Sequence, residues 1–308
     1  MSPLRQAMAD YLAVRRTLGY RLVRAEKLLA QFLTFVEARG EVHLTKETAL
    51  AWATLPATAD RGWMASRLSV VRRFALHLRG LDPATEALPL DLLPGRSRRA
   101  TPYLYSGDDI LALMSAAAGL STPHRSATYR TLIALLAVTG MRVGEAINLD
   151  RDDLDLTSGA ITIIHGKFHK PRVLPLHPTT VSALCAYLAR GDRPLQPAMS
   201  KALFVSPPGN RLLYSNVQTS FQRLVQCAGI KPRSAACRPR LHDLRHTFAV
   251  STLLDAYREE GDPAARLAVL STYLGHVDPG KTYWYLSAAP ELLQLAGDRL
   301  ERHLGGGA

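Results

Sequence analysis

The chain has 308 residues, which is long enough for two modest domains, because a single hydrophobic core rarely keeps growing beyond about 250 to 300 residues. Its 38 Lys and Arg against 26 Asp and Glu give a net charge of +12, which favours a polyanionic partner, either nucleic acid or an anionic membrane surface. With 47% hydrophobic and 21% charged residues, the composition argues against long disordered or fibrous segments.

Hydropathy and cysteine usage indicate the cellular compartment. The longest uninterrupted apolar run, 132–138, is much shorter than the roughly 20 residues that span a bilayer, and the first residues lack the pattern of a secretion leader. The cysteines, Cys185, Cys227 and Cys237, are widely spaced and form no metal-binding or redox motif. We therefore expect a soluble cytoplasmic protein, associated with the nucleoid if its partner is DNA.

The first part of the chain is predicted to be a helical domain, residues 1–95. Apolar residues recur there at three- and four-residue steps, as in Leu28, Leu29, Phe32 and Leu33. The pattern predicts four helices, near 3–17, 22–39, 46–55 and 60–79. A proline-rich stretch then ends in the basic cluster Arg96, Arg98 and Arg99, and we assign residues 96–102 as a linker.

Residues 103–308 are predicted to form a second, mixed domain. Ser106 to Asp109 is a capping signal for a helix that runs to about residue 118, and a second helix, near 125–139, stops at Gly140. A short helix follows at 142–149. Two β-rich segments, 161–165 and 172–176, flank a turn at 166–170 and predict a hairpin. Helices dominate the remainder, with one short strand expected at 203–206 and an amphipathic helix at 289–304.

The densest cluster of ionisable side chains is the His242-Asp-Leu-Arg-His246 stretch, where a helix should begin after Pro239. Residues 242, 245 and 246 share one helix face, so an imidazole and a guanidinium would converge as an oxyanion or phosphate clamp. A helix start with solvated polar residues explains the cluster equally well. A zinc site is a third interpretation, because two histidines stand four apart with Asp243 between them, but no convincing third ligand follows.

Three further stretches carry candidate residues, each with a plain structural explanation when taken alone. Arg142 stands two residues after a helix-ending glycine and could cap helix carbonyls. Lys167 and Lys170 stand in the hairpin turn, where a solvated charge is usual. His276, in a Leu-Gly-His box, precedes tyrosines that are otherwise amphipathic core residues.

In this order, the stretches together resemble the tyrosine recombinase (phage integrase) family of DNA-cleaving enzymes, and specifically its mobile-element branch. The resemblance covers residues 103–304, and the helical N-terminal part is similar to the family's core-binding domain. It implies a mainly α fold with a small β-sheet: a helical SAM-like core-binding domain followed by a mixed α/β catalytic domain. Two departures are Phe168, where the family usually has a small residue, and a long stretch between Arg245 and His276.

The resemblance also implies roles for individual residues. Tyr285, nine residues after His276, matches the nucleophile better than Tyr283, and Lys167 matches the hairpin lysine better than Lys170. Glu145 and His246 match positions that we interpret as supporting. The six positions that match catalytic residues of the family are Arg142, Lys167, His242, Arg245, His276 and Tyr285.

The chemistry that the resemblance implies suits these residue types. A tyrosine hydroxyl, with an ordinary pKa near 10, needs a base or a cationic setting to attack a phosphodiester. Two guanidiniums can stabilise the charge that develops on the phosphate, so neither a metal ion, ATP nor another cofactor is required. Lys167 would protonate the leaving 5′ oxygen, while His242 would move the proton on the nucleophile's side and His276 would donate a hydrogen bond to the phosphate.

The implied partner is a double-stranded DNA recombination site with inverted repeats, bound by a homotetramer that exchanges the helix at 289–304, or by an assembly that includes other recombinases. Packing of that helix onto its own domain is the alternative. The function could also be that of a catalytically inactive DNA-binding regulator with the same fold, or of a metal-dependent hydrolase centred on His242 and His246. The DNA-binding candidates are Arg72, Arg73, Arg96, Arg98, Arg99 and Lys170.

Overall fold

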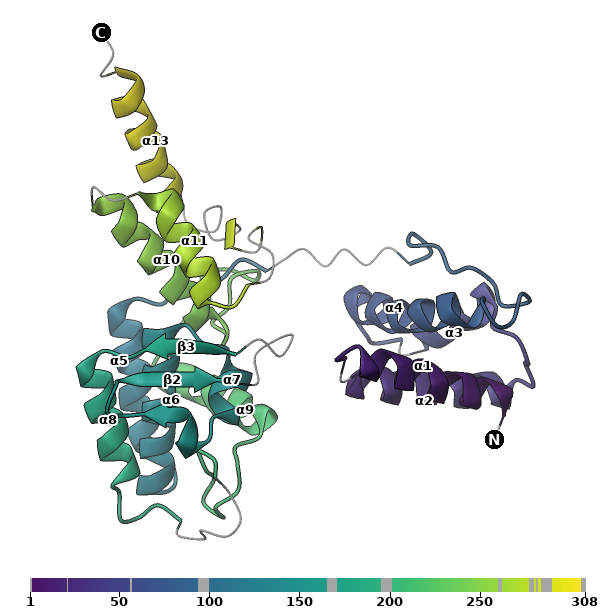
Figure 1. Ribbon diagram of the computed structural model, residues 1–308, viewed down its shortest axis with the longest axis horizontal. Helices are drawn as coiled ribbons and strands as arrows, with labels where there is room; N and C mark the ends of the chain where they lie inside the picture. Colours follow the sequence, from purple (N-terminus) through teal and green to yellow (C-terminus); the bar gives the residue numbers. More distant parts are fainter. Residues whose placement is uncertain are drawn as a thin grey trace. The chain divides into compact units, whose positions relative to one another are not determined.

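The computed structural model describes residues 2–20, 22–55, 57–93, 100–164, 171–194, 201–259, 262–276, 280, 282–283 and 290–305. The chain divides into two compact units, Met1–Arg99 and Ala100–Ala308 (Figure 1). The division lies within the stretch expected to be a linker. Throughout the described residues, helices predominate and one small sheet is present, which confirms the predicted fold class.

Unit 1 consists of helices in its described part: α1 (Pro3–Thr17), α2 (Val23–Ala38), α3 (Lys46–Thr54) and α4 (Arg61–Leu78). Each begins and ends within one residue of the predicted position. Three of them start at a residue whose side chain accepts a hydrogen bond from a backbone N–H of the first turn, namely Ser2, Thr45 and Asp60. Such caps supply acceptors that the helix start lacks, which is why the starts could be predicted from sequence.

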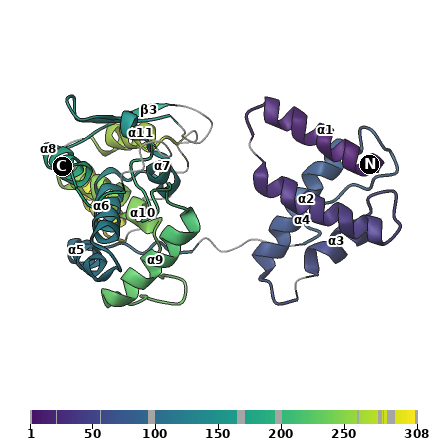
Figure 2. The same ribbon diagram turned by 90° about the horizontal axis from the view of Figure 1, so that it is seen from below.

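The core of unit 1 lies between these helices (Figure 2). Phe32 from α2 and Phe74 from α4 are fully buried, and the Phe32 ring packs edge-on against Trp52 of α3 at a centroid distance of 5.2 Å. The guanidinium of Arg67, on α4, lies over the Trp52 ring, 3.8 Å from its centroid, and donates a 2.7 Å hydrogen bond to the Trp52 carbonyl. Unit 1 is thus a helical domain with its own hydrophobic core.

Unit 2 combines helices with the sheet. Its elements in chain order are α5 (Gly107–Ala116), the 3-10 turn η1 (Ala117–Gly119), α6 (Pro123–Thr139), α7 (Val143–Asn148), the 3-10 turn η2 (Arg151–Asp153), β1 (Leu154–Asp155), β2 (Ala160–Ile163), β3 (Arg172–Pro175), α8 (Pro178–Leu188), α9 (Tyr214–Cys227), α10 (Asp243–Arg258), α11 (Pro263–Tyr273) and α13 (Pro290–Gly305).

The sheet is antiparallel in the order β1-β2-β3. β2 pairs with β3, which confirms the hairpin, and Ile163 stands opposite Arg172 in the pair nearest the connection between the two strands. The turn predicted at 166–170 lies outside the described residues. β1 was not predicted, because two residues carry too little pattern. The strand expected at 203–206 is wrong: this fully described stretch forms only a single bridge, Val205 to Arg211.

Two buried clusters support unit 2. The larger surrounds α6, with Leu132, Ile133 and Leu136 almost fully buried. The smaller lies between α10, α11 and the first turn of α13, where Leu292 is 1% exposed. Because α10 packs against both α6 and α11, it connects the two clusters. In the part of the chain that the structure describes, no helix is both long and apolar enough to cross a membrane.

Candidate active site

Arg142 stands at the start of α7, two residues after the glycine that ends α6. Gly140 has a φ of +58°, a left-handed conformation that glycine adopts without strain, so the chain reverses sharply there. The Glu145 carboxylate accepts hydrogen bonds from the Arg142 backbone N–H at 2.9 Å and from its guanidinium Nη1 at 2.7 Å. One carboxylate therefore fixes both ends of Arg142, and the second terminal nitrogen, Nη2, donates to the Gly275 carbonyl at 3.3 Å.

Glu145 is buried between two arginines. Besides Arg142, its carboxylate accepts from Nη1 and Nη2 of Arg172, at 3.1 and 2.6 Å. Burial alone would raise the pKa of Glu145, but the hydrogen bonds from Arg172 and from the Arg142 backbone outweigh it and lower the pKa to about 2. The carboxylate is therefore ionised at neutral pH. The supporting role that the resemblance suggested for Glu145 stays a prediction.

Arg245, on the first turn of α10, is only 2% exposed. Its Nη1 donates to the Gly140 carbonyl at 2.9 Å, and its Nη2 donates to the Leu274 carbonyl at 2.6 Å and lies 3.0 Å from His276 Nε2. The guanidinium thus joins the end of α6, the end of α11 and the Leu-Gly-His box. Since a buried guanidinium is costly without acceptors, these bonds explain why it lies there with fixed orientation.

His242 and His246 lie on one face of α10, as predicted from their spacing, with ring centroids 4.9 Å apart and rings nearly perpendicular. His242 is exposed and His246 is 9% exposed. Asp243 points inward: its carboxylate accepts from the backbone and side chain of Arg240, while burial raises its pKa. Among the described residues, no group of three His, Cys, Asp or Glu side chains is arranged to hold a metal ion.

His276 belongs to the same cluster through both ring nitrogens. A guanidinium can only donate, so the contact from Arg245 makes Nε2 an acceptor, and in the neutral ring Nδ1 then carries the hydrogen. That hydrogen points to the hydroxyl oxygen of the fully buried Thr282, 2.7 Å away. The predicted hydrogen bond from His276 to a phosphate therefore requires either protonation of the ring or movement of the Arg245 guanidinium onto the phosphate.

A pocket of about 360 Å3 opens beside these groups. Arg142, Glu145 and His242 line it, as do two residues that the sequence did not indicate, Asn148 and Tyr214. Tyr214 is the first residue of α9 and is 52% exposed. No motif surrounds it, so only the packing of α9 against α7 brings its phenol to the pocket.

The remaining predicted site residues differ in their exposure and contacts, and some of them lie outside the described residues. Arg73 of α4 is exposed, whereas the Arg72 guanidinium donates to the carbonyls of Leu88 and Pro89 at 3.0 and 2.7 Å and so stabilises unit 1. Tyr283 is 57% exposed. Six predicted site residues lie outside the described residues, namely Arg96, Arg98, Arg99, Lys167, Lys170 and Tyr285.

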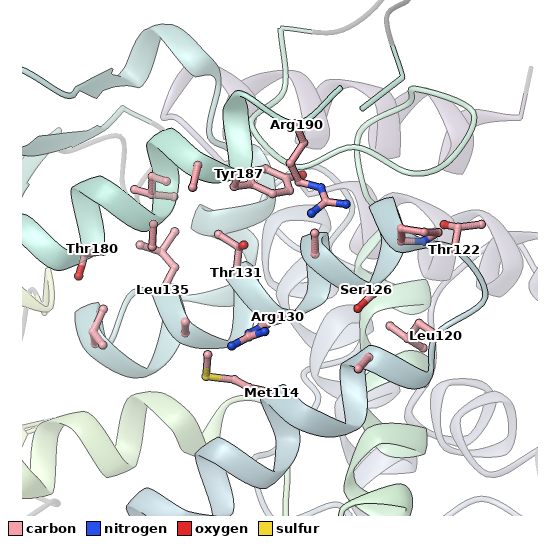
Figure 3. A pocket seen from close by; sticks show the side chains of 18 of the residues that line it. Met114, Leu120, Thr122, Ser126, Arg130, Thr131, Leu135, Thr180, Tyr187 and Arg190 are labelled. Atoms are coloured by element: carbon pink, nitrogen blue, oxygen red, sulfur yellow. The ribbon is translucent and has the colours of Figure 1, made fainter. Parts of the chain in front are cut away.

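A second, larger concavity of about 820 Å3 lies between α5, α6 and α8 (Figure 3). Its walls are mainly apolar, with Met114, Leu135 and Tyr187 among them, and two arginines, Arg130 and Arg190, also line it. None of the predicted site residues belongs to this lining. The chemistry is therefore expected at the smaller pocket, in spite of the size of the larger one.

Comparisons with known proteins concern the sequence and the fold. The model of the phage integrase family matches residues 105–291. The integrase/recombinase homologue y4rB of Sinorhizobium fredii is 43% identical over 308 residues, 98% of each chain, and the tyrosine recombinase XerD of Mycobacterium tuberculosis is 29% identical over 91% of each chain. The fold resembles that of the Tn1549 transposon integrase bound to transposon right-end DNA, with a TM-score of 0.66, 16% identity and coverage of 98% and 99% of the two chains. The chain belongs to the phage integrase family of tyrosine recombinases.

Proposed function

We propose that this site-specific recombinase cleaves and rejoins DNA strands with the phenolic oxygen of Tyr285 as nucleophile, through a 3′-phosphotyrosyl intermediate. One observation carries the proposal: Arg142 and Arg245, from α7 and α10, meet at the adjacent carbonyls of Leu274 and Gly275, beside His276 and a pocket lined by His242. Such a cluster of fixed donors suits a phosphodiester that gains negative charge in the transition state.

The charges around the cluster favour an anion. Arg142, Arg172 and Arg245 contribute three positive charges, and the ionised Glu145 contributes one negative charge. The scissile phosphodiester balances one of the two excess positive charges, and the negative charge that develops in the transition state can balance the other. The forked guanidiniums of Arg142 and Arg245 each offer donors for non-bridging oxygens, and their existing bonds to protein acceptors reduce the reorganisation needed at the moment of reaction.

The bonds and protons of the step balance without a cofactor. The Tyr285 oxygen loses its proton and forms a bond to phosphorus, while the bond from phosphorus to the 5′ oxygen breaks. We assign the first proton transfer to His242 and protonation of the departing 5′ oxygen to Lys167. Because the phosphotyrosyl bond retains the energy of the phosphodiester, attack by a second 5′ hydroxyl reverses the step and joins new partners.

We further propose that both units contact duplex DNA and that unit 1 acts as the core-binding domain. Arg73 is a better phosphate contact than Arg72, since it is exposed and the Arg72 guanidinium is engaged by carbonyls of its own unit. Arg96, Arg98, Arg99 and Lys170 remain proposed contacts on charge alone. Affinity that depends on such phosphate contacts should fall steeply as salt rises.

Assembly as a homotetramer on inverted repeats is also part of the proposal, and α13 is its exchange element. The first turn of α13 packs on its own unit, through Leu292 and a 2.5 Å ion pair between Glu291 and Arg258. On the same turn Leu293 is 58% exposed, and Leu295 on the next turn is partly exposed. Leucine side chains that its own unit leaves exposed are suited to a groove of a neighbouring protomer. Integration, excision and resolution are the outcomes such an assembly supports.

Covalent trapping tests the proposal. A pool of nicked duplexes with randomised arms is incubated with the protein in EDTA, and DNA that remains bound after denaturation is recovered and sequenced. We expect a protein–DNA band with the wild type and none with Tyr285→Phe. Tyr283→Phe and Tyr214→Phe are matched controls, the second because its phenol lies at the pocket, and both should retain the band.

The other results would contradict the proposal in distinguishable ways. Loss of the band only in Tyr283→Phe or only in Tyr214→Phe would transfer the nucleophile to that residue. Sequence-specific binding by the wild type without a covalent band would favour the inactive regulator. A band that forms equally on every recovered sequence, together with plasmid relaxation, would indicate a topoisomerase rather than a recombinase.

A further inference from the structure

The end of α11 presents three consecutive backbone carbonyls, those of residues 273–275, and each accepts a hydrogen bond from a different arginine. Arg172 Nε, from β3, donates to the first at 3.0 Å. Arg245 Nη2, from α10, donates to the second at 2.6 Å, and Arg142 Nη2, from the start of α7, donates to the third at 3.3 Å. The last carbonyls of a helix have no partner within the helix and carry partial negative charge, so this end collects cations.

Arg172 differs from the other two arginines in how its nitrogens are used. Its Nε contacts the carbonyl of Tyr273, while its Nη1 and Nη2 both contact the carboxylate of Glu145. The side chain is 12% exposed, against 25% for Arg142. A single planar guanidinium thus connects β3, α7 and the end of α11, which lies beside β3 (Figure 2).

Gly275 leaves space for this guanidinium. A Cβ atom at position 275 would lie 3.0 Å from Arg172 Nη1 and 3.2 Å from its Cζ, closer than side-chain contacts normally allow. The residue also has a φ of +66°, which favours glycine. The glycine of the Leu-Gly-His box therefore permits both the turn after α11 and the close approach of Arg172.

We propose that Arg172 is a positioning residue for strand cleavage: through Glu145 and the turn at 273–275 it holds the guanidiniums of Arg142 and Arg245 where the scissile phosphate binds. This inference rests on the proposed function. Without Arg172, the Glu145 carboxylate loses two of its four hydrogen-bond donors and the turn loses one of its three arginines. Arg142 then keeps its charge but loses its fixed direction.

The test compares single-turnover formation of the covalent complex on two substrates, using the full chain and a nicked duplex recovered with the wild type. One substrate carries the normal phosphodiester, and the other carries a methylphosphonate at the scissile position. The methylphosphonate has no negative charge, so its reaction depends less on correctly placed guanidiniums. The variants are Arg172→Met and Arg172→Lys, with Arg142→Ala as the reference for a lost phosphate contact.

Arg193→Lys is the matched control. Arg193 is also partly buried in unit 2 and donates to two backbone carbonyls, those of Ala202 and Leu203, which are not site residues. Its substitution tests whether the loss of a structural arginine in this unit is enough to slow cleavage. We expect its rate to match the wild type on both substrates.

On the phosphodiester we expect Arg172→Met to form the complex about 100-fold more slowly, because a misplacement of about 1 Å costs that much. Arg172→Lys should be about 10-fold slower, since one point charge cannot reproduce the fork. On the methylphosphonate both defects should shrink to within about 3-fold of the wild type, as should that of Arg142→Ala. If the circular dichroism spectrum of Arg172→Met differs from that of the wild type, the rates on the two substrates are compared with Arg172→Lys alone.

Three results would overturn the inference. Arg172 variants that cleave the phosphodiester at the wild-type rate would remove its premise. A defect of equal size on both substrates would show general damage rather than misplaced guanidiniums. Rescue by a 5′-bridging sulfur, a leaving group that needs no proton, would assign the effect to the leaving-group side. A wild type that forms no covalent complex on any duplex would instead reject the proposed function, and the inference with it.

Discussion

Replacement of Glu145 by glutamine should destabilise unit 2 in a pH-dependent way. The carboxylate is ionised, buried and hydrogen-bonded to Arg142 and Arg172, and its pKa is lowered from an ordinary 4.5 to about 2. A change of this size corresponds to about 3 kcal/mol of unfolding free energy, since each tenfold change in an equilibrium constant is about 1.4 kcal/mol. Glutamine has nearly the same shape but no charge, so the variant should lose most of this contribution at pH 7.

The direction of the pH dependence follows from the lowered pKa. The unfolded chain binds the proton more tightly than the folded one, so the contribution is fully present above about pH 5 and is lost as the pH falls from 4.5 towards 2. The gap in unfolding free energy between wild type and Glu145→Gln should therefore shrink from about 3 kcal/mol at pH 7 to about 1 kcal/mol at pH 3.

Urea unfolding followed by far-UV circular dichroism measures this gap. With a denaturant slope of about 3 kcal/mol per M, the midpoint of unit 2 should fall by about 1 M at pH 7. Two of the three tryptophans, Trp52 and Trp63, belong to unit 1, so the fluorescence transition of that unit serves as an internal control and should not move. A gap that stays constant from pH 7 to pH 3 would refute the assigned role of the charge.

Two further substitutions test the packing of each unit. Gly140→Ala should lower the stability of unit 2 by about 2–4 kcal/mol in urea unfolding, because its Cβ would lie 2.3 Å from Phe248 Cδ1 at a φ of +58°. Gly144→Ala, with open space at its Cβ, is the control and should be neutral or stabilising. Arg67→Ala should cost unit 1 about 2–4 kcal/mol, seen as an earlier Trp52 fluorescence transition and no change in unit 2, because it removes a buried stack and a hydrogen bond. An unfolding transition of Gly140→Ala that coincides with that of the wild type would contradict the close packing assigned to Gly140. The same result for Arg67→Ala would contradict the contribution assigned to the Arg67 side chain.

Local sequence was sufficient for the helices of unit 1 and for the first elements of unit 2. Ser106 caps α5 and Asp109 closes the capping box, as their three-residue spacing predicts, and Gly140 ends α6 in the left-handed conformation. Such signals act between residues that are neighbours along the chain, so they can be recognised without a fold. The short strand β1 could not be predicted from sequence, because a two-residue strand exists only through its pairing with β2.

The same distinction separates the parts of the candidate site. Motif order alone pointed to Arg142, Arg245 and His276, and the helical period placed His242 and His246 on one face. Folding was needed to reveal Arg172, whose partners Glu145 and Tyr273 are 27 and 101 residues away in the chain. It was equally needed to bring Tyr214 to the pocket and to direct the Arg72 guanidinium to carbonyls of its own unit. Residue type and spacing specify what a side chain can do, whereas the donors and acceptors that it meets depend on long-range packing.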